Sequence, residues 1–284
     1  MVSGKLLFLA SYFLLLASII LLITEMRIVF LGSGTSTGIP QIGCKCKVCS
    51  STNNKDKRLR ASVLISVEST KILIDCGPDL RQQLLENKID SLSGILLTHE
   101  HYDHVGGLDD VRPLGKAQVY AEKKVLNVIQ RNMPYCFGEN RYPGVPRIQL
   151  NEIDEQPFHI DNILIEPIRV MHARLPILGF RIKNVAYLTD VKTIEQKSID
   201  KLKGLDILII NALRIDEHIS HISLSEALDI SKKIGAKMTY FTHMSHDMGL
   251  HDDINAILPD NIQLAYDQLT IECDDVVIKR QNNK

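Results

Sequence analysis

The chain has 284 residues and a formal net charge of −1, and 45% of its residues are hydrophobic. This length suits one large domain or two small ones, with enough apolar residues to bury a sizeable core. The near-neutral charge argues against a protein that wraps nucleic acid, because such proteins are usually strongly basic.

The chain begins with an apolar run over residues 5–24 in which Lys5 is the single charged residue. The run is just long enough to span a bilayer, but no small-residue cleavage site follows it, so a signal peptide is disfavoured. A predicted core strand and a glycine-rich turn follow without a linker. We therefore expect residues 1–25 to be a start-site artefact, with the product beginning at Met26, or else a membrane anchor. Residues 26–284 are expected to form one domain.

Strand-like runs are frequent after Met26, with helical segments between some of them. Strands are predicted over residues 27–32, 62–68, 71–77, 94–99, 163–172, 179–183, 185–190, 205–212, 238–243 and 269–272, and helices over 78–88, 121–133 and 223–235. The last helix has a capping box formed by Ser223 and Glu226 and a natural stop at Gly235. Strands lead in the first part and alternate with helices later, which predicts a layered α/β sandwich.

Five of the predicted strands finish in, or are directly followed by, a carboxylate or an imidazole. Strand ends at the edge of a sheet are where α/β folds gather their functional sites. The sequence therefore predicts a polar site at one sheet edge, built from Asp75, His99, His172, Asp190 and His243.

The strongest motif is "THEHYDHVGG", residues 98–107, which places four ligand-type side chains within six positions. Imidazole nitrogens and a carboxylate oxygen suit zinc, manganese or iron. His99 and His101, at i and i+2 on an extended loop, can face one ion, and Asp103 and His104 can face a second. This density of ligands favours a metal site over a group of solvated loop histidines.

A second cluster lies in "GCKCKVCS", where Cys44, Cys46 and Cys49 fall within six residues. In a chain of this length such spacing is more typical of metal binding in a reducing compartment than of a disulfide framework. An iron–sulfur cluster is disfavoured because it usually needs four cysteines. A structural zinc site also needs a fourth ligand. The residues alone leave four candidates for it: Cys76, Cys136, Cys273 and His246.

The His-x-His-x-Asp-His signature and the order of the strand-end residues resemble the metallo-β-lactamase superfamily over residues 26–284. The resemblance implies a four-layer αββα sandwich with a dinuclear centre of zinc or manganese at one edge. Asp75 would orient the ligands, and a hydroxide bridging the two ions would attack phosphorus in line. One ion would take His99, His101 and His172, and the other Asp103, His104 and His243, with Asp190 bridging.

Within the superfamily, "MHARLPILGFRI" looks like the phosphodiesterase and ribonuclease Z branches. The stretches "GTSTGIPQIGCKCKVC" and "THMSH" resemble the phosphoribosyl 1,2-cyclic phosphate phosphodiesterase (PhnP) family, in which a structural zinc is closed by the later histidine of a His-x-x-His pair. This resemblance implies one structural zinc on Cys44, Cys46, Cys49 and His246. Ribonuclease Z normally lacks the cysteine insertion, and PqqB-type proteins lack the intact active-site motif that this chain keeps.

His221 lies two residues before the capping Ser223 of a predicted helix. A helix N-terminus attracts anions, and a histidine beside it can contact a phosphate oxygen or protonate a leaving alkoxide. Because the phosphodiesterase branches resemble this segment, we expect His221 to be catalytic. His159, His218 and His251 are expected to be ordinary surface histidines.

The leading hypothesis is a metal-dependent phosphodiesterase acting on a small cyclic phosphate ester, such as phosphoribosyl 1,2-cyclic phosphate or a cyclic nucleotide. Two alternatives stay open: a nuclease of the ribonuclease Z or DNA-end type, and a non-catalytic metal-binding module. The expected partner is a small phosphate ester, and nucleic acid is disfavoured. A membrane contact is expected only if residues 5–24 are retained, and a homodimer is a further option. The expected location is the cytoplasm.

Overall fold

A computed structural model describes residues 26–138, 141–273 and 278–281. Residues 1–25, for which the sequence predicts a start-site artefact or a membrane anchor, lie outside the described part. Within that part, no helix combines the length and the apolar character needed to cross a bilayer.

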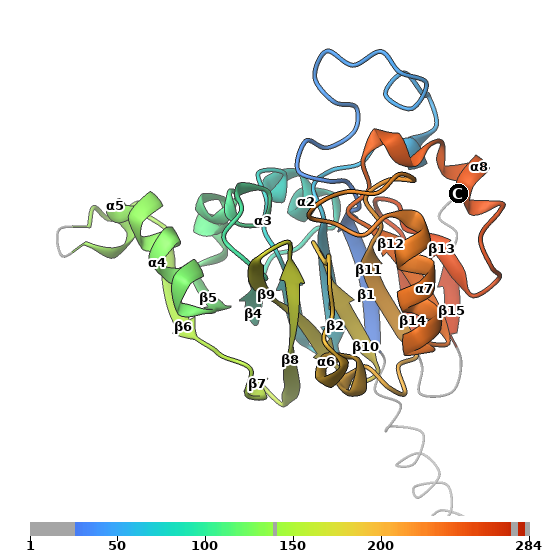
Figure 1. The fold of residues 1–284 in the computed structure, drawn as a ribbon. Coiled ribbons are helices and arrows are strands. Elements are labelled where there is room, and N and C mark those ends of the chain that lie inside the picture. Colours follow the sequence, from blue (N-terminus) through green and yellow to red (C-terminus); the bar gives the residue numbers. More distant parts are fainter. Residues whose placement is uncertain (1–25, 139–140, 274–277, 282–284) are drawn as a thin grey trace, which may run out of the picture.

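The chain folds into two sheets with helices on their outer faces (Figure 1). The strands are β1 (Met26–Gly32), β2 (Ser62–Val67), β3 (Thr70–Ile74), β4 (Gly94–Leu96), β5 (Lys116–Ala121), β6 (Arg147–Glu152), β7 (Phe158–Ile160), β8 (Ile163–His172), β9 (Leu175–Ile182), β10 (Val185–Leu188), β11 (Ile207–Asn211), β12 (Met238–Thr242), β13 (Ile262–Leu264), β14 (Thr270–Cys273) and β15 (Ile278–Gln281). The helices are η1 (Asn54–Asp56), α2 (Leu80–Glu86), α3 (Tyr102–Val105), η2 (Leu108–Leu114), α4 (Lys123–Asn132), α5 (Pro134–Phe137), α6 (Gln196–Lys201), α7 (Leu224–Ile234), η3 (His246–Met248) and α8 (His251–Asn255).

The first sheet has the strand order β15-β14-β1-β2-β3-β4-β5-β6, and the second has the order β13-β12-β11-β10-β9-β8-β7. Apolar side chains of both sheets, including Phe30, Phe180 and Tyr240, pack together in a central core. A second core lies between the first sheet and helices α2 and α4. A third lies between the second sheet and helices α6 and α7. These three cores define four layers, and the predicted αββα sandwich is confirmed.

Each of the ten predicted strands has a counterpart in the structure, and so do the three predicted helices. Strand β9 begins earlier than predicted, because it pairs with β8 along its whole length, from His172 opposite Leu175 onward. Strands β5, β6, β7, β13 and β15 were not predicted from the sequence. Four of these, β6, β7, β13 and β15, are edge strands, and each contains at most two alternating apolar residues, a pattern too short to predict a strand.

The capping box of α7 is present as predicted. Ser223 Oγ accepts the Glu226 N–H, and the Glu226 side chain accepts the Ser223 N–H at 2.7 Å. Gly235 ends the helix with φ of 73°, a left-handed conformation that glycine adopts without steric cost. The start of α7 is therefore fixed by local chemistry, and the N-cap Ser223 lies two residues after His221.

Replacing Ser223 with alanine should lower the free energy of unfolding by about 1 kcal/mol, because an N–H at the helix start loses its acceptor. Urea unfolding followed by circular dichroism measures this change. Ser69, an exposed serine in the turn between β2 and β3, provides the matched control, since Ser69→Ala removes a hydroxyl that caps no helix. Equal stability of the two variants would contradict the capping role.

Candidate metal centres

The polar strand-end residues meet at one edge of the sandwich, as predicted. Asp75 follows β3 and Asp190 follows β10, and His243 directly follows β12. All three have positive φ angles, of 61°, 55° and 55°. A residue other than glycine pays roughly 1 kcal/mol for this left-handed conformation. Such strain at three neighbouring strand ends is typical of a functional site.

The Asp190 carboxylate lies in the middle of the cluster and is itself buried, with 2% exposure. Its Oδ1 lies 3.1 Å from His243 Nε2 and 3.5 Å from His104 Nε2. Its Oδ2 lies 3.3 Å from His221 Nε2 and 3.6 Å from His99 Nε2. One carboxylate therefore contacts the Nε2 atoms of four histidines, which is the position that a bridging ligand needs.

The potential ligand atoms fall into groups that share Asp190, and in each group they lie within 4.8 Å of one another. One group joins His99 and His101 to Asp190. Another joins Asp103, His104 and His243 to it, as the resemblance implied. His172 departs from expectation, because its group is formed with Asp190 and His221. Its ring centroid lies 5.2 Å from that of His101 and 5.7 Å from that of His99.

Asp75 orients histidines of both main groups. Its Oδ2 lies 2.7 Å from His104 Nδ1, so this nitrogen donates and Nε2 is the atom that can bind an ion in place of a proton. The Thr98 hydroxyl donates to Asp75 at 3.0 Å and lies 2.9 Å from His99 Nδ1. His99 Nδ1–H therefore donates to Thr98, and His99 Nε2 is also left free to bind an ion. Asp75 thus has the place of an orienting carboxylate.

Two residues of this network were not identified from the sequence. Thr98 links Asp75 to His99, and the Ser220 carbonyl accepts a hydrogen bond from His172 Nδ1 at 2.9 Å. The Ser220 contact explains why His172 groups with His221, because Ser220 and His221 belong to the same loop. Neither role has a sequence signal, since threonine and serine are common at strand ends and in loops.

Charges inside the cluster are strongly coupled. Burial disfavours the charged form of His104, but the carboxylates of Asp190, Asp75 and Asp103 outweigh that effect and raise its pKa well above the usual value. Burial likewise disfavours ionised Asp190, yet His243 and His104 hold its pKa well below the usual range. The carboxylates therefore need positive charge close by.

The residues present fit divalent metal ions. His99 Nε2, His104 Nε2 and His243 Nε2 are buried, and they have no hydrogen-bond partner in the described part of the chain. An unsatisfied buried polar atom costs roughly 1–3 kcal/mol. Zinc or manganese bound to these nitrogens and to the carboxylates would satisfy them. His101 is exposed, unlike the other histidines of these groups.

His221 borders the same cluster. Burial lowers the pKa of His221 to about 4, and the Asp190 carboxylate opposes that effect. His218 is half-buried and contacts His221, and His159 is exposed as expected. The expectation that His251 is a surface histidine is wrong. His251 is 2% exposed, because its Nδ1 packs at 3.2 Å against the buried guanidinium of Arg58.

The cysteine cluster is completed by His246. His246 Nδ1 lies 3.3 Å from Cys44 Sγ, 3.4 Å from Cys46 Sγ and 3.5 Å from Cys49 Sγ. A tetrahedral zinc ion would separate nitrogen from sulfur by roughly 3.5 Å. Hydrogen bonding, first from the Cys49 N–H, lowers the pKa of Cys46 to about 6, which favours the thiolate that binds metal. Of the four candidates for the fourth ligand, the structure therefore brings His246 to the three cysteines.

The loop that carries the cysteines is attached to the segment that carries His243. Gly34 forms a bridge to Met244, and Thr35 N donates to the Met244 carbonyl at 3.0 Å. The buried Arg58 donates to Ser33 Oγ and to the Ala265 carbonyl. A metal ion on the cysteines and His246 would complete this attachment, next to the cluster around Asp190.

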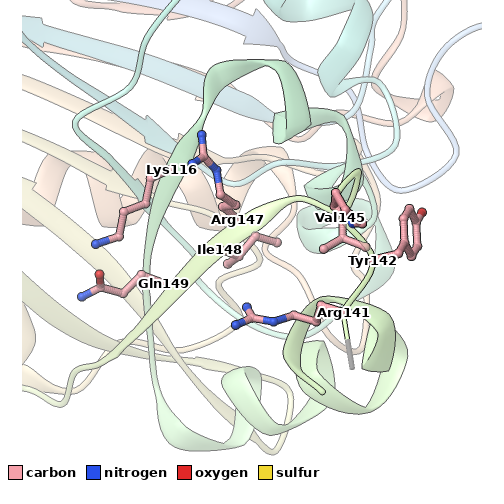
Figure 2. Close-up of a pocket in the computed structure, with 8 residues that line it drawn as sticks. Lys116, Arg141, Tyr142, Val145, Arg147, Ile148 and Gln149 are labelled. Atoms are coloured by element: carbon pink, nitrogen blue, oxygen red, sulfur yellow. The ribbon is translucent and has the colours of Figure 1, made fainter. Parts of the chain in front are cut away.

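A separate pocket of about 390 Å³ is shown in Figure 2. Side chains at the starts of β5 and β6, including Lys116 and Arg147, line it together with the segment before β6. Its lining residues include none of the candidate metal ligands.

Residues 70–244 match the family described as "Beta-lactamase superfamily domain". This range contains Asp75 and every candidate ligand from His99 to His243. The chain therefore belongs to the metallo-β-lactamase superfamily, and it has the fold and the donor set of a metal-dependent hydrolase. Within the superfamily it is similar to a crystal structure described as a new diphosphatase from the PhnP family. That likeness has 38% identity and a TM-score of 0.84, over 89% of this chain and 99% of the other.

Two further relatives place the chain more broadly. A protein of Porphyromonas gingivalis named octanoyltransferase is 46% identical over 260 residues, which are 89% of this chain but 53% of that protein. Zinc-bound PqqB of Methylobacterium extorquens shares the fold, with a TM-score of 0.71 and 19% identity, over 86% of this chain and 99% of the other. The chain spans about half or less of the curated relatives it matches.

Replacing Asp75 with asparagine should weaken metal binding about 10- to 100-fold. An amide N–H would face His104 Nδ1–H, so the imidazole must change tautomer and lose the free lone pair at Nε2. Asparagine tolerates the positive φ of residue 75, so the substitution adds little backbone strain. Metal titration by calorimetry measures the effect. Asp90→Asn, at an exposed position, is the control, and equal affinities of the two variants would contradict the orienting role.

Replacing Cys46 with serine should reduce bound zinc by about one ion per chain and lower the free energy of unfolding by more than about 2 kcal/mol. Activity should fall with stability, while the pH dependence of the remaining activity stays the same, because the cysteine site takes no part in proton transfer. Elemental analysis and thermal unfolding measure the two effects. Unchanged zinc content in this variant would refute the assignment of a structural zinc.

Proposed function

We propose that the protein is a metal-dependent phosphodiesterase that hydrolyses a small cyclic phosphate ester. The observation that carries the proposal is the placement of Asp190 among two groups of ligand atoms, with His221 beside them. A carboxylate shared by two ligand groups suits a pair of ions, and paired ions are the usual catalysts of displacement at phosphorus.

In this proposal His99 and His101 hold one ion together with Asp190, and Asp103, His104 and His243 hold the other. His172 would be a further ligand, on the side of the cluster where His221 lies. Bound ions would supply Lewis acidity and an activated water molecule. Asp75 and Thr98 orient two of the metal ligands, because their hydrogen bonds fix the imidazoles of His104 and His99.

His221 is proposed as the proton donor to the leaving oxygen. Its Nε2 faces Asp190 at 3.3 Å, so it lies at the border of the ligand cluster without being enclosed by it. A bound phosphate diester brings negative charge close to this ring, which favours its protonated form. Opening of a cyclic ester expels an alkoxide, and an alkoxide needs a proton as the P–O bond breaks.

A structural zinc on Cys44, Cys46, Cys49 and His246 is part of the proposal. Its role would be to hold the loop of residues 33–61 against the segment that begins at His243. A closed site with four protein ligands has no open position for a substrate, so its contribution is support of the neighbouring centre.

A second candidate function is hydrolysis of a diphosphate bond. The relative with 38% identity is described as a diphosphatase. The same pair of ions and the same in-line displacement would serve a diphosphate, because the bond broken is again a P–O bond. The two candidate functions differ in the leaving group. Hydrolysis of a diphosphate expels a phosphate, whereas hydrolysis of a cyclic ester expels a sugar alkoxide.

A panel of substrates offered to the metal-loaded protein tests the proposal. The panel holds phosphoribosyl 1,2-cyclic phosphate, a 2′,3′-cyclic nucleotide, a nucleoside diphosphate, precursor tRNA and a β-lactam. We expect turnover of a cyclic ester, its loss on chelation of the metal, and a roughly 10²- to 10⁴-fold lower kcat in His221→Ala. Cleavage of the diphosphate alone would favour the second candidate, and cleavage of the tRNA alone would overturn both.

A further inference from the structure

Ser220, in the loop before α7, makes hydrogen bonds to three histidines. Its carbonyl oxygen lies 2.9 Å from His172 Nδ1. Its Oγ lies 3.0 Å from His221 Nδ1 and 3.2 Å from His218 Nδ1, and its N–H donates to His218 Nδ1 at 3.3 Å. A half-buried serine with this set of partners is more constrained than an ordinary loop serine.

The directions of these hydrogen bonds follow from the partners that each atom faces. Because the Ser220 N–H donates to His218 Nδ1, this nitrogen is an acceptor. The single lone pair of His218 Nδ1 is thereby used, so the Ser220 hydroxyl is left to pair with His221 Nδ1 at 3.0 Å. In the protonated ring that the proposed function requires, both nitrogens of His221 donate, so Nδ1–H donates to Ser220 Oγ. His221 Nε2, on the other side of the ring, faces Asp190.

We propose that Ser220, supported by His218, is a positioning residue that holds His221 with Nδ1 protonated and Nε2 directed at the reacting atoms. The main-chain carbonyl of the same residue holds His172. One residue would therefore set the orientation of the proton donor through its side chain and of a candidate metal ligand through its backbone. The proposal rests on the proposed function, in which His221 protonates the leaving oxygen.

The chemical consequence concerns the step in which the ester bond breaks. A water molecule supplies the oxygen that joins phosphorus and releases one proton to solvent. As the P–O bond to the leaving group breaks, its electron pair stays on that oxygen, which takes the proton from His221 Nε2. The ring is left neutral with its Nδ1–H still bound to Ser220, so its orientation does not change during the step. A carboxylate plays the equivalent part for the histidine of serine hydrolases.

Ser220→Ala separates the two roles of this residue, because it removes the hydroxyl but keeps the carbonyl that contacts His172. Metal content should therefore stay at the wild-type level. For a diester with an alkyl leaving group, kcat should fall about 10-fold or more with KM changed less than about twofold, because proton donation loses its orientation. For a nitrophenyl diester, whose leaving group needs little protonation, kcat should change less than about twofold.

Two further variants complete the design. Ser220→Thr keeps the hydroxyl and should restore most of kcat for the alkyl ester, and Ser69→Ala serves as the control for loss of an exposed serine hydroxyl. An equal fall in kcat for both leaving groups, or loss of metal from Ser220→Ala, would show a merely structural role and overturn the proposal.

A measurement that needs no turnover separates this inference from the proposed function. In ¹H–¹⁵N spectra of the metal-loaded protein, His221 should show a protected Nδ1–H in the wild type and in Ser220→Thr, and this signal should be lost in Ser220→Ala. Absence of a His221 Nδ1–H from the wild type overturns the positioning role, even if cyclic esters are cleaved. If neither diester is cleaved and the signal behaves as expected, the proposed function fails and the positioning role stands.

Discussion

The contact of one buried carboxylate, Asp190, with the Nε2 atoms of four histidines is the interaction on which the rest of the site depends. Burial penalises a charge of either sign, so such a group is stable only when opposite charges are balanced at short range. Protonated imidazoles supply part of the balancing positive charge. Divalent ions would supply the rest at the positions that the free Nε2 atoms face.

The sandwich makes this balance of charges possible by bringing strand ends from both sheets to one edge. Asp75 comes from the first sheet, and Asp190 and His243 come from the second, and each adopts a left-handed conformation where its strand ends. The apolar core between the sheets offsets the cost of that strain, because more than twenty buried side chains pack there. The hydrogen bonds of Asp75 and Thr98 then limit the imidazoles to the tautomers that can bind a metal.

Much of the architecture could be predicted because its signals are local. Buried strands such as β1 and β11 are continuous apolar runs, and the capping box of α7 lies within four residues. The edge strand β6 was missed because it is partly polar, and the burial of His251 was missed because it depends on Arg58, which is distant in the sequence. Contacts between residues that are distant in the sequence produce no periodic pattern of apolar residues from which they could be predicted.

The sequence by itself determined the donor types and their spacing in "THEHYDHVGG" and "GCKCKVCS", because adjacent residues in a motif stay adjacent in any fold. Only the tertiary structure decided which distant residues join them. Of the four candidates that the residues alone left open, it brought His246 to the cysteines across about 200 positions of the chain. It also grouped His172 with His221 and connected Asp75 to two histidines. The physical reason is that such contacts depend on sheet packing and on left-handed strand ends, which are properties of the whole fold.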